Sequence, residues 1–271
     1  MDSIKAFVHK FFAGLGIGVL SMNGLLRSQR LASLGVFKIA GLLRESPFAS
    51  SFTDAHKDVI LSNFRSQLGQ DVFALSLLGP SRSGFFVEFG ATNGIDLSNT
   101  YLLESQFGWK GILCEPGAVW HKQLRKNRTA TIDSRCVFSE SGRSLSFLET
   151  DIPELSTING FGVSDEHSKT RLANRSYEVE TVSLLDLLKQ HNAPTHIDFL
   201  SIDTEGSELE ILSTFDFSKY TFGGICIEHN FTPNRQKIQD LLVSKGYLQV
   251  YPELSQYDDW FVLETNQNIS I

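Results

Sequence analysis

The stretch FFVEFGATNG, residues 85–94, decides the fold that we expect for this chain. Four apolar residues around Glu88 predict a short buried strand at 85–89, and the residues from Gly90 to Gly94 predict a tight loop at its carboxyl end. Ligands of open α/β sheets bind outside the carboxyl ends of the strands, where glycine lets the backbone approach them closely. The stretch therefore predicts a site for a nucleotide-like ligand.

Strand and helix patterns alternate from residue 85 onward, which is typical of a parallel sheet covered by helices. We expect five parallel strands at 85–89, 111–114, 135–138, 197–202 and 224–227. Further strands are expected at 145–148 and 178–182, and helices at 99–107, 119–127, from Ser183 onward, at 207–215 and from 232 up to Gly246. A closing hairpin at 247–263 completes one doubly wound α/β domain, and the polar interval 153–176 predicts a substrate loop.

The first 80 residues predict a helical extension that precedes the ligand-binding domain at 81–271. Apolar residues recur at helical spacing up to residue 45, and helices are expected again at 54–68 and 71–78. The apolar stretch 11–22 is too short to span a bilayer comfortably. We expect it to form a helix that packs on the domain or makes peripheral contact with a membrane surface; a targeting or anchoring segment is the alternative.

The chain is acidic, with a net charge of -7 and an isoelectric point near 5.5. This charge argues against a basic groove for nucleic acid and favours small or neutral substrates. The three cysteines, Cys114, Cys136 and Cys226, lie in strand-like runs with no pair at metal-binding or redox spacing. They are therefore expected to be reduced and buried, as in a cytoplasmic protein.

Two observations narrow the class of ligand that the glycine loop can bind. Gly90 and Gly94 match neither the GxGxxG of dinucleotide folds nor the GxxxxGK[ST] of phosphate-binding loops. The second strand ends in Glu115, and an acid at that position can accept both ribose hydroxyls of an adenosine. The alternatives are a plain strand-to-helix turn for the glycines and an exposed loop acid for Glu115.

Six sequence blocks occur in an order that resembles the FkbM family of S-adenosylmethionine-dependent methyltransferases. They are VEFGATNG at 87–94, SNTYLLE at 98–104, GWKGILCEP at 108–116, VETVSLLDLL at 179–188, FLSIDTEGSELEIL at 199–212 and IEHN at 227–230. The resemblance covers about two-thirds of the chain, from residue 85 to residue 263, and leaves the first 80 residues outside it. It implies a Rossmann-like class I methyltransferase sheet, with S-adenosylmethionine as the cofactor.

Carried over residue by residue, the resemblance also implies a cofactor site. The methionine end of S-adenosylmethionine would lie over Glu88, Gly90 and Gly94, and the ribose on Glu115. Residues 135–137 would border the adenine. The remaining expected cofactor contacts are Ser98, Asn99, Thr100 and Asp203.

Methyl transfer to a hydroxyl group needs a base or a metal ion, and the ends of the fourth and fifth strands offer both. His229 is a candidate general base, with Asp203 and Glu205 as further catalytic candidates. Alternatively, oxygen atoms of Asp203, Glu228 and Asn230 are the hard ligands that Mg²⁺ favours. The competing interpretations are helix caps for Asp203 and Glu205 and a merely hydrogen-bonded His229.

Other charged residues are expected on solvated helix faces, namely Glu208, Glu210 and the basic run 121–128. The sequence thus predicts an O-methyltransferase for a hydroxyl of a sugar, a glycan or a small natural product. A non-catalytic S-adenosylmethionine-binding scaffold is the alternative. An NAD-dependent dehydrogenase would need a dinucleotide fingerprint that this sequence lacks. The sequence leaves the oligomeric state open.

Overall fold

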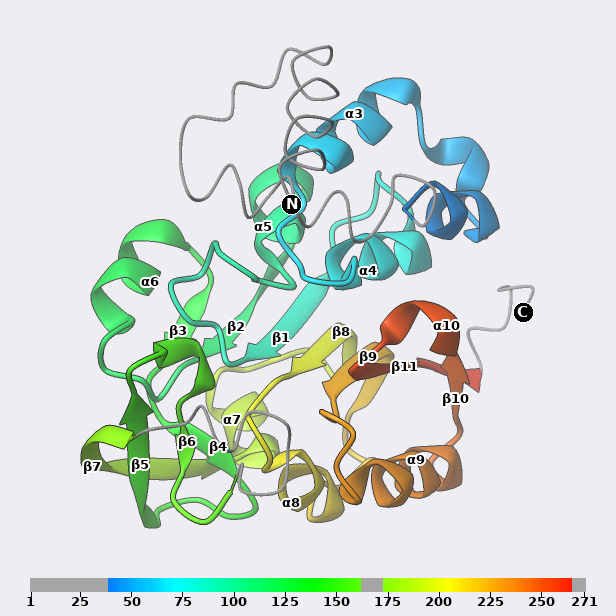
Figure 1. The fold of residues 1–271 in the computed structure, drawn as a ribbon. Helices are drawn as coiled ribbons and strands as arrows, with labels where there is room; N and C mark the ends of the chain where they lie inside the picture. Colours follow the sequence, from blue (N-terminus) through cyan, green and yellow to red (C-terminus); the bar gives the residue numbers. More distant parts are fainter. Residues whose placement is uncertain (1–38, 162–172, 265–271) are drawn as a thin grey trace, which may run out of the picture.

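The computed structural model describes residues 39–161 and 173–264, which form two sheets flanked by helices (Figure 1). The main sheet has seven strands in the order β10-β11-β9-β8-β1-β2-β3. Their bounds are β1 Phe85–Phe89, β2 Lys110–Cys114, β3 Thr131–Asp133, β8 His196–Ile202, β9 Thr221–Glu228, β10 Tyr247–Val250 and β11 Asp258–Leu263. Neighbours from β9 to β3 pair in parallel, whereas β11 is antiparallel to both β9 and β10. The doubly wound sheet and its antiparallel C-terminal hairpin are thus confirmed.

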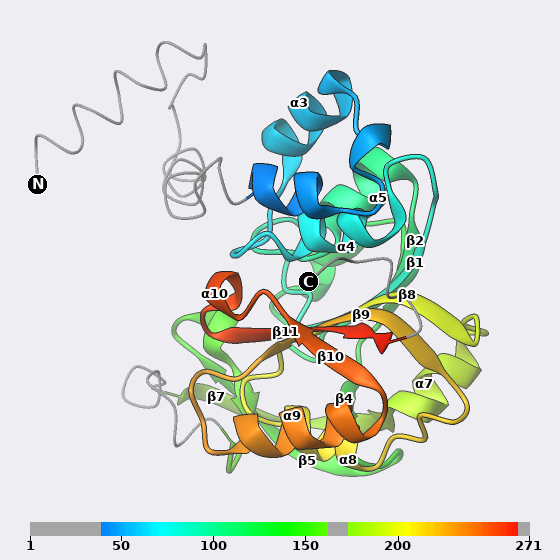
Figure 2. The ribbon, with the colours of Figure 1, turned by 90° about the vertical axis from the view of Figure 1, so that its right-hand side faces the viewer.

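Helices cover both faces of the main sheet because successive strand residues point to opposite sides. Phe86 joins the core under α3 Asp54–Asn63, α4 Gln70–Leu78, α5 Tyr101–Phe107 and α6 His121–Asn127. Val87 joins the opposite core, which is closed by α7 Leu184–Gln190, α8 Glu208–Ser213 and α9 Asn234–Ser244. Figure 2 shows α3, α4 and α5 on one side of the sheet and α7, α8 and α9 on the other.

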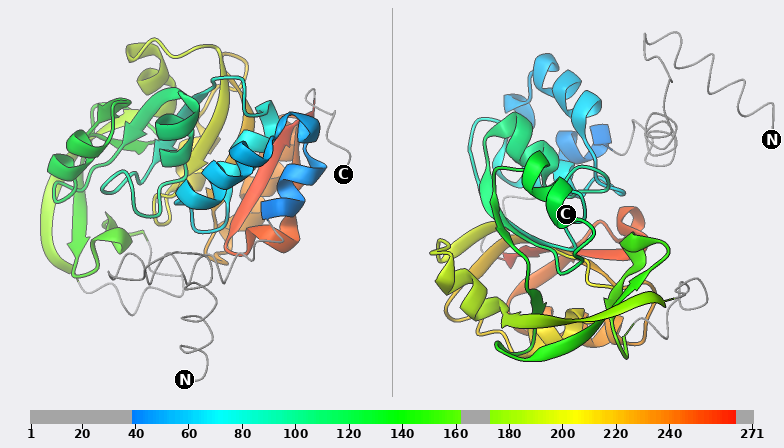
Figure 3. Two further views of the ribbon diagram at one scale, coloured as in Figure 1. Left: turned by 90° about the horizontal axis from the view of Figure 1, so that it is seen from above. Right: turned by 90° about the vertical axis from the view of Figure 1, so that its left-hand side faces the viewer.

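A second sheet lies beside the main one on the side of β3, in the order β4-β7-β5-β6 (Figure 3, green). Its strands are β4 Cys136–Phe138, β5 Ser144–Thr150, β6 Thr157–Ile158 and β7 Ala173–Ser183. The expectation that 135–138 forms the third strand of the main sheet is wrong. That place is taken by β3, and β4 pairs with β7 instead. The change of sheet follows Asp133, whose carboxylate binds the Arg135 backbone N–H at 2.9 Å and turns the chain away from the main sheet.

The described part of the N-terminal region is helical and packs onto the sheet. Residues 39–45 are helical, and a short 3₁₀ helix, η1 Ala49–Ser51, precedes α3. α3 ends at Asn63 rather than at the expected residue 68, and residues 64–69 form a connection to the almost wholly buried α4. Within 39–161 and 173–264, no helix has both the length and the apolar character needed to cross a membrane. The apolar stretch 11–22 lies outside the described residues.

Two short elements complete the fold, namely η2 Pro153–Leu155 and α10 Pro252–Ser255. η2 and β6 both belong to the interval 153–176, for which a substrate loop is predicted. Residues 162–172 of that interval lie outside the described part of the chain. The described part of the interval reaches the carboxyl ends of the main-sheet strands, where it forms one wall of a cavity.

Candidate active site

A cavity of about 340 Å³ opens at the carboxyl ends of the main-sheet strands. Four neighbouring strands each bring an acidic side chain to its lining, and in sheet order these are Glu115, Glu88, Asp203 and Glu228. Tyr257, which directly precedes β11, also lines the cavity. The volume is within the roughly 300–1,000 Å³ that is usual for small-molecule sites.

The glycine loop is shaped by the neighbouring strand. Gly90 has φ +74°, and a Cβ atom there would lie 2.2 Å from the carbonyl oxygen of Asp203. A side chain at residue 90 would therefore separate the ends of β1 and β8. Gly94 has another role, because a Cβ atom there would lie 2.6 Å from Arg128 Cγ. Gly94 does not line the cavity, and its small size lets the loop pack against α6.

Glu88 holds the chain segment that follows the glycine loop. Its carboxylate accepts hydrogen bonds from the Asn99 backbone N–H at 2.7 Å, from the Ser98 hydroxyl and from the Thr100 hydroxyl. Burial raises the pKa of Glu88, and the nearby Arg128 guanidinium opposes this rise. Ser98 and Thr100 face Glu88 and do not line the cavity, whereas Asn99 does. The Asn99 Nδ2 atom donates to Ser201, and its buried Oδ1 atom has no hydrogen-bond partner among the described residues.

Arg128 is buried, in contrast to the solvated helix face expected for the basic run 121–128. Its side chain is 1% exposed, and its Nε atom lies 2.7 Å from Glu104 Oε2. The guanidinium also donates to the Gly94 carbonyl oxygen and to the hydroxyls of Ser98 and Thr100. Arg128 therefore ties the glycine loop to the segment that Glu88 binds.

Glu115 is fixed by two backbone donors at the end of β2. The N–H groups of Thr92 and Gly117 each donate to one of its carboxylate oxygens at 2.7 Å. Burial raises the pKa of Glu115 to about 7, since it outweighs these hydrogen bonds and is helped by the charges of Asp203 and Glu88. Each oxygen keeps a second lone pair, so the side chain can accept two further hydrogen bonds.

Of the three residues expected near an adenine, two line the cavity and one does not. Cys136 and Val137 line the cavity together with Trp120, on the same side as Glu115. Arg135 does not line it, because its guanidinium forms two hydrogen bonds with Asp133. Partial burial opposes ionisation of Asp133, but the hydrogen bonds from Arg135 and one from His191 lower its pKa to about 2.

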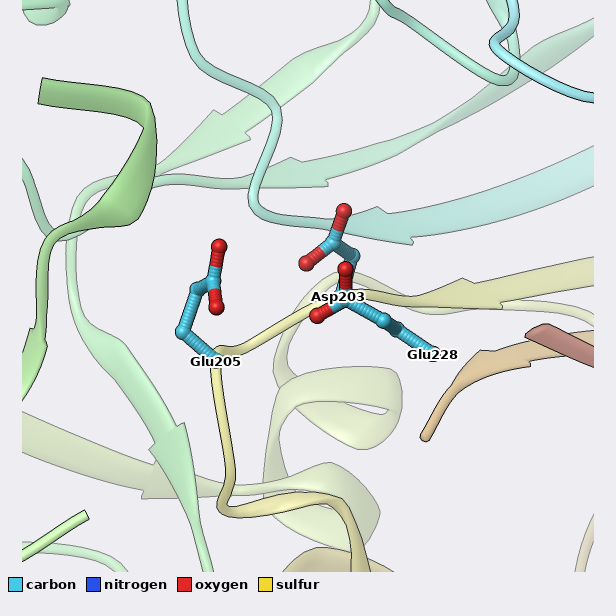
Figure 4. Close-up of side chains that lie close together, drawn as sticks. All are labelled: Asp203, Glu205 and Glu228. Atoms are coloured by element: carbon cyan, nitrogen blue, oxygen red, sulfur yellow. The ribbon is translucent and has the colours of Figure 1, made fainter. Parts of the chain in front are cut away.

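Three carboxylates lie close together at the carboxyl ends of β8 and β9 (Figure 4). One oxygen from each of Asp203, Glu205 and Glu228 lies within 4.8 Å of the others. Burial raises the pKa of Glu228 well above its ordinary value, and the charges of Asp203, Glu205 and Glu208 raise it further. A proton placed among these groups is therefore held more tightly than on an ordinary carboxylate.

Glu208, expected on a solvated helix face, is buried and shapes this turn. Its Oε1 atom accepts hydrogen bonds from the backbone N–H groups of Thr204 and Gly206 and from the Thr204 hydroxyl. Glu208 thus fixes the turn that leads from β8 into α8, whereas the N-cap residue Ser207 makes no side-chain capping hydrogen bond. Glu205 has φ +59° and lines the cavity with Asp203.

His229 and Asn230 follow β9 but face different surroundings. Asn230 lines the cavity, so the expected metal-binding set of Asp203, Glu228 and Asn230 does share one space. The His229 side chain does not line it. Its Nδ1 atom accepts a hydrogen bond from the Phe231 N–H at 3.0 Å, and its Nε2 atom lies 3.8 Å from Asp259. Burial lowers the pKa of His229, so the neutral imidazole is favoured.

Several lining residues were not identified from the sequence. The second sheet and the η2 region contribute a largely apolar wall, and Gln67 and Tyr257 close the side next to β11. The residues missed are Gln67, Phe89, Thr92, Leu97, Cys114, Pro116, Trp120, Phe147, Thr204, Ser207 and Tyr257. The interval 153–176, for which a substrate loop is predicted, adds Pro153, Glu154, Leu155, Ser156 and Ile158 to the lining. No lysine, arginine or histidine lines the cavity in the described part of the chain, and six acidic residues do.

Comparisons with known proteins give one family match and several distant structural likenesses. Methyltransferase FkbM from Methylobacillus flagellatus KT shares 11% identity at a TM-score of 0.41, over 79% of this chain and 58% of that one. Precorrin-6y C5,15-methyltransferase from Geobacter metallireducens GS-15 shares 14% at 0.36, over 66% and 71%. CurJ carbon methyltransferase shares 10% at 0.33, over 96% and 78%. No curated protein matches the chain.

The family match covers the part of the chain that builds the site. A model described as the methyltransferase FkbM domain matches residues 88–266, from the middle of β1 to beyond β11. This range includes all the acidic residues that line the cavity. The chain belongs to the FkbM methyltransferase family.

Proposed function

We propose that this methyltransferase transfers the methyl group of S-adenosylmethionine to a hydroxyl group of a sugar, a glycan or a small natural product. The observation that carries the proposal is the row of acidic side chains at four adjacent strand ends, which all face one cavity. The half of the row near β2 suits a cationic adenosine cofactor. The half near β9 suits the removal of a proton from a hydroxyl.

The residues of the β1–β2 half fit the cofactor. Bound S-adenosylmethionine would supply a methyl group made electrophilic by its positively charged sulfur. Glu115 would accept hydrogen bonds from the ribose hydroxyls through the free lone pairs of its fixed carboxylate. The Asn99 Oδ1 atom, which has no hydrogen-bond partner in 39–161 or 173–264, would accept one from an ammonium group. The absence of a side chain at Gly90 leaves room for close approach of the cofactor.

The residues of the β8–β9 half supply the acid–base chemistry. Transfer to a hydroxyl would replace its O–H bond with an O–CH₃ bond and would leave S-adenosylhomocysteine, so the hydroxyl proton would need an acceptor. Asp203, Glu205 and Glu228 offer that acceptor, since their mutual repulsion favours the binding of one proton. We assign the role to these carboxylates rather than to His229, whose ring lies outside the lining.

The charge of the lining restricts the acceptor. Six carboxylic side chains and no basic side chain line the cavity in the described residues. An acceptor with a phosphate or carboxylate close to its reactive hydroxyl would be repelled and would lose hydration without gaining a partner. The acceptor is therefore neutral or cationic around the reacting group.

Calorimetry with S-adenosylhomocysteine and transfer assays with S-adenosylmethionine carrying a tritiated methyl group test the proposal. Glu115→Gln is expected to weaken binding chiefly, and Asp203→Asn is expected to abolish transfer while the fold is retained. Asp240→Asn, on the exposed side of α9, serves as the matched control. Folded wild-type protein that does not bind at millimolar ligand would refute the proposal. Binding without transfer in a broad hydroxyl screen would favour a cofactor-binding scaffold.

A cation-dependent version of the reaction is a second candidate, favoured by the spacing of the three carboxylates. Asp203, Glu205 and Glu228, with Asn230 beside them, would present hard oxygen ligands to Mg²⁺. The role of such an ion would be to acidify a hydroxyl bound to it. Transfer that stops with EDTA and returns with Mg²⁺ would support this version, and transfer unaffected by EDTA would exclude it.

A further inference from the structure

The connection between α3 and α4, residues 64–69, reaches the cavity although it lies outside the family match at 88–266. We call it the strap; it is the cyan segment between these helices in Figure 1. Gln67 is its lining residue. The site thus includes one residue from a segment outside the part of the chain that the family model matches.

The strap is held in place from α4. The Asp71 carboxylate accepts hydrogen bonds from the Arg65 N–H at 3.0 Å and from the Ser66 hydroxyl at 2.6 Å. The Gln70 side chain accepts one from the Leu68 N–H at 2.8 Å and donates to Asp258 at 2.7 Å. These bonds satisfy strap backbone groups on both sides of Gln67, so its position is fixed.

The strap contacts the chain on both sides of the strand ends that carry Asp203 and Glu228. Ser66 forms a β-bridge with Leu97, in the loop that follows β1. Gln67 Oε1 accepts a hydrogen bond of 2.5 Å from the Tyr257 hydroxyl, directly before β11. In the sheet, β8 and β9 lie between β1 and β11. The strap therefore passes above the strand ends that carry Asp203 and Glu228.

Tyr257 is anchored to the same strand ends. Its carbonyl oxygen accepts hydrogen bonds from the backbone N–H groups of His229 at 2.8 Å and Asn230 at 3.2 Å. Since β11 lies three strands from β1 and four from β2, the Gln67–Tyr257 pair is on the opposite side from Glu115. The pair borders the part of the cavity that the proposed function leaves for the acceptor.

We infer that Gln67 is a specificity-determining residue, which donates a hydrogen bond from its side-chain amide to the methyl acceptor. Its Oε1 atom is occupied by Tyr257, and its Nε2 atom makes no hydrogen bond to another described residue. All the charged side chains that line the cavity in the described residues are carboxylates, which only accept hydrogen bonds when ionised. An oriented amide N–H supplies a donor that a neutral, hydroxyl-bearing acceptor can use. The inference rests on the proposed function, because it concerns the acceptor of that reaction.

Two substitutions test whether Gln67 donates a hydrogen bond to the acceptor or only holds Tyr257 in place. Gln67→Ala removes both the donor and the bond to Tyr257, whereas Gln67→Glu can still accept from Tyr257 but offers no N–H when ionised. Gln106→Ala, on the exposed part of α5, is the control. The probes are S-adenosylhomocysteine for affinity, and S-adenosylmethionine with a tritiated methyl group plus a panel of neutral methyl glycosides for transfer. Saturation-transfer NMR on the protein loaded with S-adenosylhomocysteine measures glycoside binding directly.

Both Gln67 variants are expected to lower kcat/KM for the best panel member at least tenfold, mainly through KM, with the Kd for S-adenosylhomocysteine unchanged within twofold. Transfer by Gln67→Ala within twofold of the wild type would overturn the inference alone. Normal transfer by Gln67→Glu with loss in Gln67→Ala would also overturn it, since Gln67 would then only hold Tyr257 in place. If the wild type binds S-adenosylhomocysteine but neither binds nor methylates any glycoside, the inference and the proposed acceptor class fail together.

Discussion

Replacement of Arg128 by methionine tests whether one buried cation holds the glycine loop of the site. Methionine keeps much of the length and apolar bulk of arginine but removes its charge and all its donors. The substitution would leave two acidic partners, Glu88 and Glu104, without their cation. It would also break hydrogen bonds to the Gly94 carbonyl oxygen and to the hydroxyls of Ser98 and Thr100.

The expected loss in the free energy of unfolding is about 3–5 kcal/mol, the usual effect of removing one partner from a buried ion pair. For a chain of this size it corresponds to a fall in Tm on the order of 10 °C. The loss has a pH dependence. Burial already raises the pKa of Glu88, and without Arg128 it rises further. The folded variant then binds a proton that the unfolded chain releases, so its stability falls as pH rises and recovers as pH falls through the folded-state pKa.

Urea unfolding at several pH values measures this loss, with Arg125→Met on the exposed side of α6 as the control. The double variant Arg128→Met with Glu88→Gln is expected to lose less than the sum of the single variants, because no buried charge is left at residue 88. A loss below about 1 kcal/mol for Arg128→Met would contradict the reasoning. Strict additivity in the double variant would show that Arg128 and Glu88 do not interact.

Two further predictions concern the same edge of the sheet. Gly90→Ala should cost about 1–3 kcal/mol of stability and strongly weaken binding of S-adenosylhomocysteine, because its Cβ would lie 2.2 Å from the Asp203 carbonyl oxygen. Gly142→Ala has a similar φ of +79° but no atom within 4 Å, so an equal effect on binding there would contradict this explanation. The pKa of Glu115, raised by burial from 4.5 to about 7, predicts that ligand-free protein loses roughly 3 kcal/mol of stability from this group as pH rises from about 4.5 to 7. Glu115→Gln should lack that part of the pH dependence in urea unfolding, and an unchanged slope would show that Glu115 titrates normally.

The strands that carry the site could be predicted from the sequence because they are apolar runs with an acid at or next to their carboxyl end. β1, β8 and β9 are buried on both faces, so each gives a clear strand pattern. β3 has three residues, of which Asp133 is the buried one, and its pattern is too weak to compete with the apolar Cys136–Phe138. Local hydrophobicity favours Cys136–Phe138 but does not indicate which sheet a strand joins.

The residues that close the site could not be predicted in the same way. Gln67 and Tyr257 meet through a hydrogen bond between distant parts of the chain, and neither lies in a strand. Arg128 belongs to a basic run that looks solvated, but its partners Glu88 and Glu104 come from β1 and α5. A pattern along the chain shows the period of an element, whereas these contacts depend on how the elements pack.

The position of β11 between β9 and β10 also governs how the chain can fold. Trp260 of β11 is fully buried and stacks on Phe73 of α4, with ring centroids 5.0 Å apart. The core on this face of the sheet therefore cannot close until the ribosome has made both residues. Until then, a nascent chain exposes the apolar edge of β9, and such an edge invites aggregation. Refolding should accordingly be slow and limited by this late pairing, as is usual for contacts between residues far apart in sequence.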